Sequence, residues 1–275
     1  MLDILSYGFF QNALLGVLTV SIAAAIIGTY IVTRRMVFIA GGVTHACFGG
    51  LGLGYFLGIS PILMAGVFAV ASSLGVEWLS KRQSVREDSA IGVIWALGMA
   101  IGTLFIFLTP GYVPELNSFL FGNILTISSA DIAAFIVYLA ILIGFFLVFY
   151  RHIIACAFDV DFARTMNLPA TAINCAMTVL VAVCIVLTIR LIGIMLLLSL
   201  FTMPQMIAEN FTRHFRPMAL LSVAVSAVCS VVGLVSSYII DVPASSTIVI
   251  TLVATYSTAR IIKSIGNKTR KKSLQ

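Results

Sequence analysis

The chain contains 275 residues, of which 61% are hydrophobic and only 9% are charged. Charged residues make up about a quarter of an ordinary soluble domain, so this composition excludes a soluble globular protein and indicates a polytopic membrane protein. The formal net charge of +6 does not indicate nucleic-acid binding. The basic residues lie in short links between apolar runs and in the tail 268–272, a distribution typical of cytoplasmic loops.

A membrane-spanning helix needs about 20 mostly apolar residues. Nine stretches approach this length: 9–33, 38–57, 60–79, 89–108, 131–150, 171–189, 191–208, 217–240 and 244–262. The count falls to eight if one of them is re-entrant or broken. We therefore predict an all-α, polytopic transmembrane helical bundle of eight to nine spans. It would form a single membrane domain over 1–265, followed by a basic cytoplasmic tail over 266–275.

The distribution of Lys and Arg predicts the orientation, because cytoplasmic loops collect these residues. With nine spans and the first running inward, fifteen of the sixteen basic residues face the cytoplasm and only Arg190 lies outside. We therefore predict a multi-pass protein of the cell (inner) membrane with its N-terminus outside and its C-terminus in the cytoplasm. The first apolar run lacks a preceding basic region and is long, so we do not expect a cleaved signal peptide.

Two links differ from plain loops. The outer loop 109–117 contains two prolines and leads into 118–125, which is apolar but too short to cross and is expected to form an interfacial or re-entrant helix. The inner loop 151–169 is the longest polar segment. Within it, 158–168 has the pattern of a short amphipathic helix with acids near its start, where they suit the helix dipole, and a proline at its end.

His45 lies in a glycine-rich apolar stretch, 38–54, inside the second predicted span. An ionisable side chain at membrane depth is costly and usually faces a bundle interior or an aqueous path. Gly41, His45 and Gly49 share one face of the helix. A neutral imidazole is a ligand for Zn, Cu, Fe and Ni, so one hypothesis is a metal path. The alternative is a histidine that is hydrogen-bonded between helices and only stabilises packing.

The sequence lacks the common catalytic motifs: GxxxxGK[ST] for binding phosphate, HExxH, and GxSxG. The acids near the spans, Glu77, Asp131, Glu209 and Asp241, all lie at span edges, and His45 has no acid at helical spacing. We therefore do not expect an enzyme.

Several separated motifs together resemble one family, the permease subunit of the zinc, manganese and iron importers of the ATP-binding-cassette class. They occur in the family's order over nearly the whole chain: Arg34-Arg-Met-Val-Phe38, Thr44-His-Ala46, Glu87-Asp-Ser-Ala-Ile-Gly92, Ser118-Phe-Leu-Phe-Gly122 with Asp131, Phe158-Asp-Val-Asp-Phe-Ala163, Gly193-Ile-Met-Leu-Leu197 through Pro204, and Asp241-Val-Pro-Ala-Ser245. The resemblance implies a homodimer in the lipid bilayer, a cytoplasmic ATP-binding subunit that hydrolyses ATP, and an extracytoplasmic metal-binding protein. It implies no cofactor other than the transported divalent metal, and no nucleic acid.

By this resemblance, His45 is the metal ligand of a translocation path that also includes Thr44 and Gly41. The family commonly carries an Asp one helical turn before the His, and this chain has Gly41 there. Without that carboxylate the site must recruit another ligand, use water or bind less tightly. Manganese prefers oxygen ligands, whereas a nitrogen-led site suits zinc. Zinc is therefore the expected cargo, with manganese and iron as alternatives.

The resemblance also implies that the short helix at 158–168 couples the permease to its ATPase. Phe158 and Phe162 would be its packing anchors. Its polar rim would consist of Asp159, Asp161 and Arg164.

The ion would be delivered from outside, near the loop at 109–118 and Asp241. Two other functions stay open. One is a permease of the same assembly class for another substrate or for efflux, which the missing Asp leaves open. The other is a stand-alone secondary metal carrier, although such carriers often show midplane acids or inverted repeats, and neither is apparent in this sequence.

Overall fold

The computed structural model describes the backbone of residues 7–82, 85–111, 122, 124 and 127–272, and the side chains of these residues except 81–82 and 266–272. Most of the expected outer segment 109–125 therefore lies outside the described residues, as do the side chains of the predicted basic tail 266–275. Every regular element in the described part is a helix, which confirms the all-α prediction.

Eight of the described helices are long and apolar enough to cross a membrane, within the predicted eight to nine. They are α1 (Gly8–Thr33), α2 (Val37–Leu57), α3 (Pro61–Arg82), α4 (Glu87–Leu108), α6 (Ser129–Phe158), α8 (Ala170–Ile192), α10 (Phe215–Ile240) and α11 (Ala244–Lys272). These limits follow the apolar runs because a backbone in lipid must satisfy its N–H and C=O groups internally, as a helix does. The backbone of α11 continues beyond its apolar run and includes most of 266–275.

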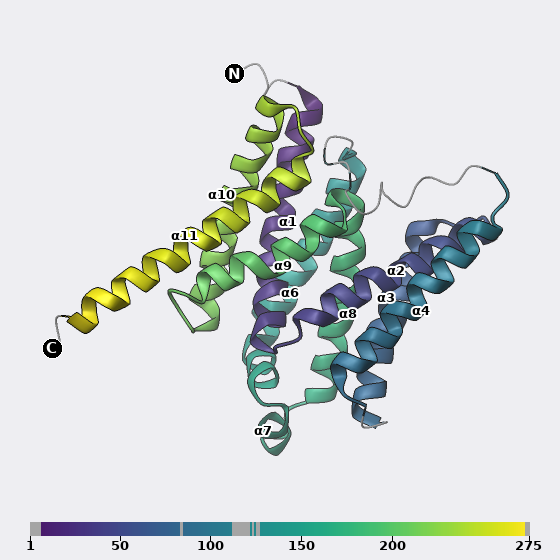
Figure 1. Cartoon of the computed structure of the whole chain (residues 1–275). Coiled ribbons are helices and arrows are strands. Elements are labelled where there is room, and N and C mark those ends of the chain that lie inside the picture. The colour runs from purple at the N-terminus through teal and green to yellow at the C-terminus, as the bar shows by residue number, and fades with distance from the viewer. Residues whose placement is uncertain (1–6, 83–84, 112–121, 123, 125–126, 273–275) are drawn as a thin grey trace.

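The expected span at 191–208 is divided between the end of α8 and a shorter helix, α9 (Ile194–Ala208). The break falls at Gly193, whose φ of 80° lies in the region that favours glycine. The 15 residues of α9 extend about 22 Å at 1.5 Å per residue, less than the roughly 30 Å of a bilayer core. α9 nevertheless reverses the direction of α8 and leads the chain back toward the end of the bundle where α10 begins (Figure 1).

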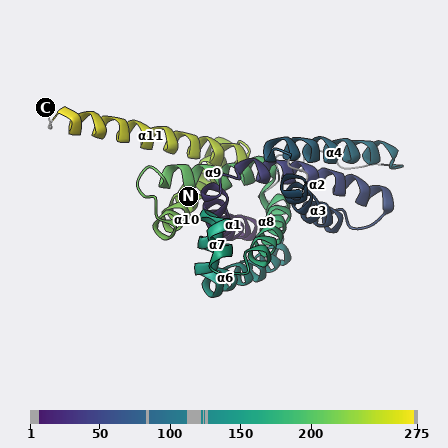
Figure 2. The same ribbon diagram turned by 90° about the horizontal axis from the view of Figure 1, so that it is seen from below.

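The helices form two groups around a central α1 (Figure 1). α1 packs against α6, α8, α9 and α10. α2, α3 and α4 pack mainly against one another, and α3 joins them to α8. Seen from below, α4 and α11 extend toward opposite sides of the molecule (Figure 2). The His45 segment therefore lies in a different part of the bundle from the C-terminal helix.

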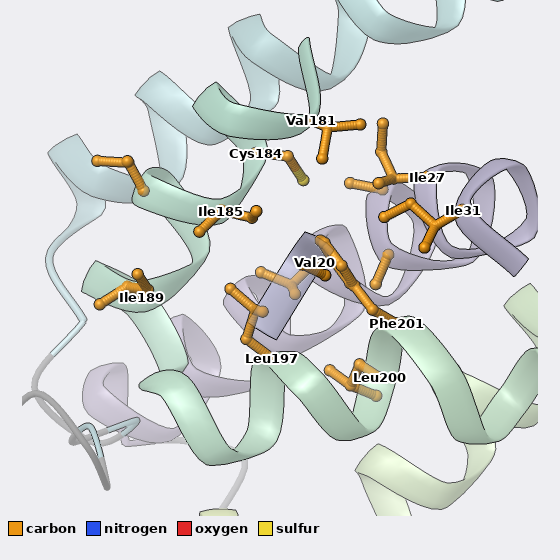
Figure 3. Packing of buried hydrophobic residues seen from close by; sticks show 14 of the residues in the cluster. Val20, Ile27, Ile31, Val181, Cys184, Ile185, Ile189, Leu197, Leu200 and Phe201 are labelled. Atoms are coloured by element: carbon orange, nitrogen blue, oxygen red, sulfur yellow. The ribbon is translucent and has the colours of Figure 1, made fainter. Parts of the chain in front are cut away.

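A tightly packed part of the core lies where α1, α8 and α9 meet (Figure 3). Val20 and Ile27 of α1, Ile185 of α8, and Leu197 and Phe201 of α9 are fully buried there. Lipid tails are as apolar as these side chains, so close van der Waals packing, and not transfer out of water, holds such helices together.

The segment 151–169, expected as a polar inner loop, is mostly helical. α6 kinks at Phe149 and then continues through the first part of this segment as far as Phe158. α7 (Val160–Thr165) follows and is shorter than the expected helix over 158–168. Asn167 has a φ of 55° and turns the chain out of the helix. The short helix was therefore predicted correctly in kind, but its limits were too wide.

Candidate functional site

His45 lies on α2 with its ring stacked on Trp95 of α4. The ring centroids are 4.4 Å apart and the planes differ by 2°. The side chain of His45 is half-buried, and its Nδ1 is buried without a hydrogen-bond partner among the described residues. At this nitrogen the structure therefore gives no support to the alternative in which the imidazole ties two helices together by a hydrogen bond. The Nδ1 of His152 on α6 is likewise buried without a described hydrogen-bond partner. A missing partner is therefore not enough to identify a functional histidine, and its position in the bundle must be considered as well.

Backbone contacts between α2 and α4 set the position of the His45 ring. A Cβ added to Gly98 would lie 2.5 Å from the Cα of Ala46, and one added to Gly52 would lie 2.8 Å from the Cα of Gly102. Real Cβ atoms do not approach other carbons this closely, so larger residues would force the helices apart. Small residues let membrane helices approach in this way. The glycine-rich stretch therefore brings α2 against α4 and the imidazole against Trp95.

Trp95 was not among the predicted site residues, because it lies on a different helix from His45. Two sequence features could have drawn attention to Trp95. It lies between Gly92 and Gly98 on α4, and it is one of only two tryptophans in the chain. The stacked pair is a tertiary feature that neither local sequence reveals.

The two other predicted path residues have different surroundings. Gly41 lies one turn before His45, and an added Cβ would have Leu198 of α9 as its nearest neighbour, at 3.9 Å. That is ordinary van der Waals contact, so the position has room for a side chain. Thr44 is fully buried, and its hydroxyl donates to the carbonyl of Ala40 in its own helix. The Thr44 hydroxyl is thus satisfied within α2.

No group of three or more His, Cys, Asp and Glu side chains that could hold a metal occurs within the described residues. That part of a single chain therefore does not build a three-ligand centre around His45. Structural zinc sites commonly have four protein ligands and catalytic ones three. Any further ligands for an ion at His45 would have to come from other groups or from water.

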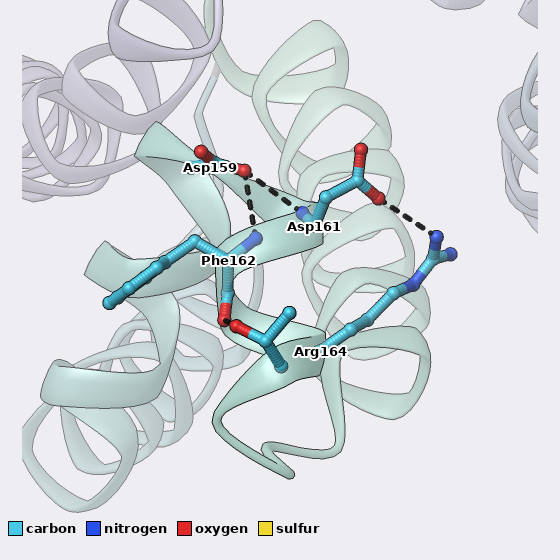
Figure 4. Close-up of polar contacts among 5 residues, drawn as sticks. Asp159, Asp161, Phe162 and Arg164 are labelled. Atoms are coloured by element: carbon cyan, nitrogen blue, oxygen red, sulfur yellow. Dashed lines mark hydrogen bonds and ion pairs between the residues drawn. The ribbon is translucent and has the colours of Figure 1, made fainter.

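The segment predicted to couple the permease to an ATPase is held by its own polar residues (Figure 4). Asp159 caps α7, because its Oδ1 accepts hydrogen bonds from the backbone N–H groups of Asp161 and Phe162 at 3.0 and 2.9 Å. Arg164 donates to Asp161 at 3.2 Å. Phe158 and Phe162 are 65% and 58% exposed, so both are open to a partner. The role that the structure shows for Asp159 is that of a helix cap.

An ion pair joins the start of α6 to the end of α8. Arg190 Nη2 lies 2.8 Å from Asp131 Oδ1. Ser128 caps α6 by accepting a hydrogen bond from the Asp131 N–H, and its hydroxyl donates to Asp131 Oδ2 at 2.6 Å. Arg190 is the one basic residue that the predicted orientation places outside, and this pair gives it a local role there.

Pro204 lies inside α9 without ending it. Proline has no N–H to donate to the carbonyl four residues earlier, that of Leu200. Gln205 supplies a donor instead: its Nε2 lies 3.3 Å from Leu200 O and 3.0 Å from Ala24 O on α1. Gly28 of α1 leaves room for this amide, since an added Cβ would lie 2.7 Å from Gln205 Cδ. Gln205 therefore compensates for the proline and ties α9 to α1.

Comparison with known proteins gives a consistent result. Residues 6–263 match the sequence profile of the ABC 3 transport family. An uncharacterized membrane protein of Synechocystis sp. is 37% identical over 252 residues, covering 91% of this chain and 89% of the relative. The manganese transport system membrane protein MntC of Listeria innocua is 27% identical over 252 residues, covering 92% of this chain and 89% of the relative.

A solved structure, PsaBC from Streptococcus pneumoniae in complex with Fab, contains a chain with a TM-score of 0.83 and 26% identity, over 94% of this chain and 93% of that chain. The family match runs from the start of the first helix into α11 and includes every motif on which the sequence resemblance rests. The chain therefore belongs to the ABC 3 transport family and is a multi-pass membrane permease of that family.

Proposed function

We propose that this permease belongs to an ATP-binding-cassette importer of a divalent transition metal, with zinc as its cargo. The observation that carries the proposal is His45, an imidazole inside a predicted span whose Nδ1 has no hydrogen-bond partner among the described residues. An imidazole nitrogen is a ligand for zinc and its neighbours in the first transition row. The name of the Listeria innocua relative, a manganese transport system membrane protein, supports the metal class.

Uptake of radioactive zinc and manganese by cells that depend on this permease tests the role of His45. His45→Ala should abolish accumulation of the metal. His152→Ala is the matched control, because His152 also has a buried Nδ1 without a described partner but lies on α6. Normal uptake by a His45→Ala variant that reaches wild-type levels in the membrane would refute the proposed path.

Manganese is the second candidate cargo, and the ligand preferences of the two metals separate them. Carboxylate oxygen suits manganese, whereas nitrogen suits zinc. Gly41 has room for a side chain, with Leu198 at 3.9 Å from an added Cβ. Gly41→Asp should raise manganese uptake relative to zinc uptake, whereas the uncharged Gly41→Asn should not. Rescue of wild-type cells under chelation by manganese but not by zinc would make manganese the cargo.

The assembly that we propose contains two copies of this chain, a cytoplasmic ATP-binding subunit at α7 and an extracytoplasmic metal-binding protein on the opposite side. ATP hydrolysis takes place in the ATP-binding subunit. Phe162→Asp should weaken co-purification of that subunit. Phe211→Asp, on the link between α9 and α10 and similarly exposed at 62%, should not. Metal uptake that needs neither ATP nor a second subunit would instead indicate a secondary carrier.

A further inference from the structure

A polar hollow of about 310 Å³ lies between the end of α9, the link to α10, and α11. Its polar lining consists of Glu209, Asn210, Arg213, Tyr256, Arg260 and Lys263. Three of these side chains are cationic and one is anionic, so the lining carries a net positive charge. None of them lies on α2, α4 or α7, and the proposed transport path uses none of them.

The lining residues come from both sides of the hollow. Tyr256, Arg260 and Lys263 follow one another at spacings of four and three residues, so they lie on one face of α11. Asn210 lies opposite: its Oδ1 accepts from Lys263 Nζ at 3.5 Å, and its Nδ2 donates to Met206 O at 3.0 Å. A guanidinium group binds phosphate oxygens through two parallel N–H donors, and an ammonium group binds them as a point charge.

The face of α11 opposite the hollow is apolar. Ile261, Ile262 and Ile265 lie there and are 60%, 59% and 59% exposed. The C-terminal end of α11 then extends away from the other helices (Figures 1 and 2). By the predicted orientation, it lies at the cytoplasmic boundary of the membrane. Basic hollows between helices on that side bind anionic lipid headgroups. The apolar face on the other side of α11 suits contact with the surrounding acyl chains, which keeps this helix at the membrane surface.

We propose that this hollow binds the phosphate headgroup of an anionic phospholipid and thereby anchors the C-terminal half of α11 to the cytoplasmic leaflet. Arg213, Arg260 and Lys263 neutralise the phosphate, and Tyr256 adds a neutral hydrogen-bonding group. Glu209 lowers the positive charge of the lining, which disfavours a doubly charged free phosphate more than the singly charged phosphodiester of a lipid. The inference does not depend on which metal the permease carries.

Binding of fluorescent phosphatidylglycerol to the full chain, purified in detergent and stripped of lipid, tests the proposal. Each basic residue near an anionic headgroup contributes roughly fivefold in affinity. Arg260→Gln should therefore weaken binding about fivefold, and Arg213→Gln with Arg260→Gln about 25-fold. Arg260→Lys should retain most of the affinity. Arg151→Gln is the matched control, because it makes the same charge change on α6, outside the hollow.

Equal binding of phosphatidylglycerol and phosphatidylcholine would overturn the proposal, as would phosphatidylglycerol binding that is unaffected in the Arg213→Gln, Arg260→Gln variant. An equal loss in Arg151→Gln would also overturn it, because total charge and not the hollow would then govern binding. Inorganic phosphate that binds as tightly as the lipid would overturn the lipid assignment in favour of a free anion. Elution of each variant at the wild-type volume in size-exclusion chromatography separates loss of binding from loss of fold.

Discussion

Substitution of alanine at two glycines of α2 separates the role of close helix packing from the general effect of glycine on a helix. In Gly52→Ala, the new Cβ would meet the carbonyl oxygen of Gly102 on α4 and lie 2.8 Å from its Cα. In Gly41→Ala, the nearest atom to the new Cβ is Leu198 Cδ2 at 3.9 Å. Both variants add one methyl group to the same helix, but only the first adds it against a rigid backbone.

The expected magnitudes follow from these distances. Carbon atoms pack best at about 3.5–4.0 Å, so Gly52→Ala must separate α2 and α4 locally by roughly 1 Å. Overpacking of this kind costs about 1–3 kcal/mol. Replacing glycine by alanine in a helix contributes up to about 1 kcal/mol of stability in either variant. Gly41→Ala should therefore be stabilised by about 0.5–1 kcal/mol, and Gly52→Ala should be less stable than Gly41→Ala by about 1–3 kcal/mol.

Unfolding of the two variants by SDS in mixed micelles gives this difference directly. Gly66→Ala on α3 serves as a second control, because an added Cβ there meets nothing within 4 Å. Metal uptake should fall in Gly52→Ala, because the contact that holds His45 against Trp95 is displaced, and should persist in Gly41→Ala. A Gly52→Ala variant that is as stable as Gly41→Ala would refute the claim that backbone contact sets the α2–α4 distance.

Three further predictions concern polar contacts. A double-mutant cycle of Asp131→Asn and Arg190→Gln, measured by SDS unfolding, should give a coupling energy of about 0.2–1 kcal/mol, because the ion pair is partly exposed. A coupling energy of zero would contradict the ion pair. Gln205→Met keeps the shape of the side chain but removes its donor to α1, and should cost about 0.6–1.7 kcal/mol in the same assay. Asp159→Ala removes the cap of α7, which should lower the stability of this helix by about 1 kcal/mol and speed hydrogen exchange over 160–165. Asp159→Asn can still cap the helix and should show little change in either measurement.

Much of the fold could be predicted from the sequence, because hydropathy follows a strict physical requirement. A backbone in lipid must form helices, so the apolar runs predicted α1, α2 and α4 closely. The requirement weakens where the chain leaves the lipid. The final turns of α6 carry Arg151 and His152, and their polarity suggested a loop. These turns are helical, but they follow a kink at Phe149, where φ is −103° and ψ is 16°, so the predicted span end at 150 lies next to this kink. Likewise, the sequence does not distinguish Gly193, where the helix breaks, from the other glycines within apolar runs.

The candidate site was predictable only in part, because most of its contacts cross between helices. His45 could be identified from its own sequence, since an ionisable residue within an apolar run is rare. Its stacking partner Trp95 could not, because only the glycine contacts of the folded pair bring α4 against α2. Gln205 was missed for the same reason: no sequence pattern shows that its amide meets the carbonyl of Ala24 on α1.

Polar side chains inside this bundle differ in whether they donate a hydrogen bond to a neighbouring helix, and that difference indicates what each substitution would disturb. The Gln205 Nε2 and the Tyr138 hydroxyl donate to backbone carbonyls of neighbouring helices, so their loss should reduce stability, although the Gln205 Oε1 has no partner among the described residues. His45 Nδ1 has no such partner among the described residues, and backbone contacts of Gly52 and Gly98 fix the helices around it. Truncation of His45 should therefore leave the helix packing largely in place. Loss of uptake in His45→Ala would then report on transport and not on folding.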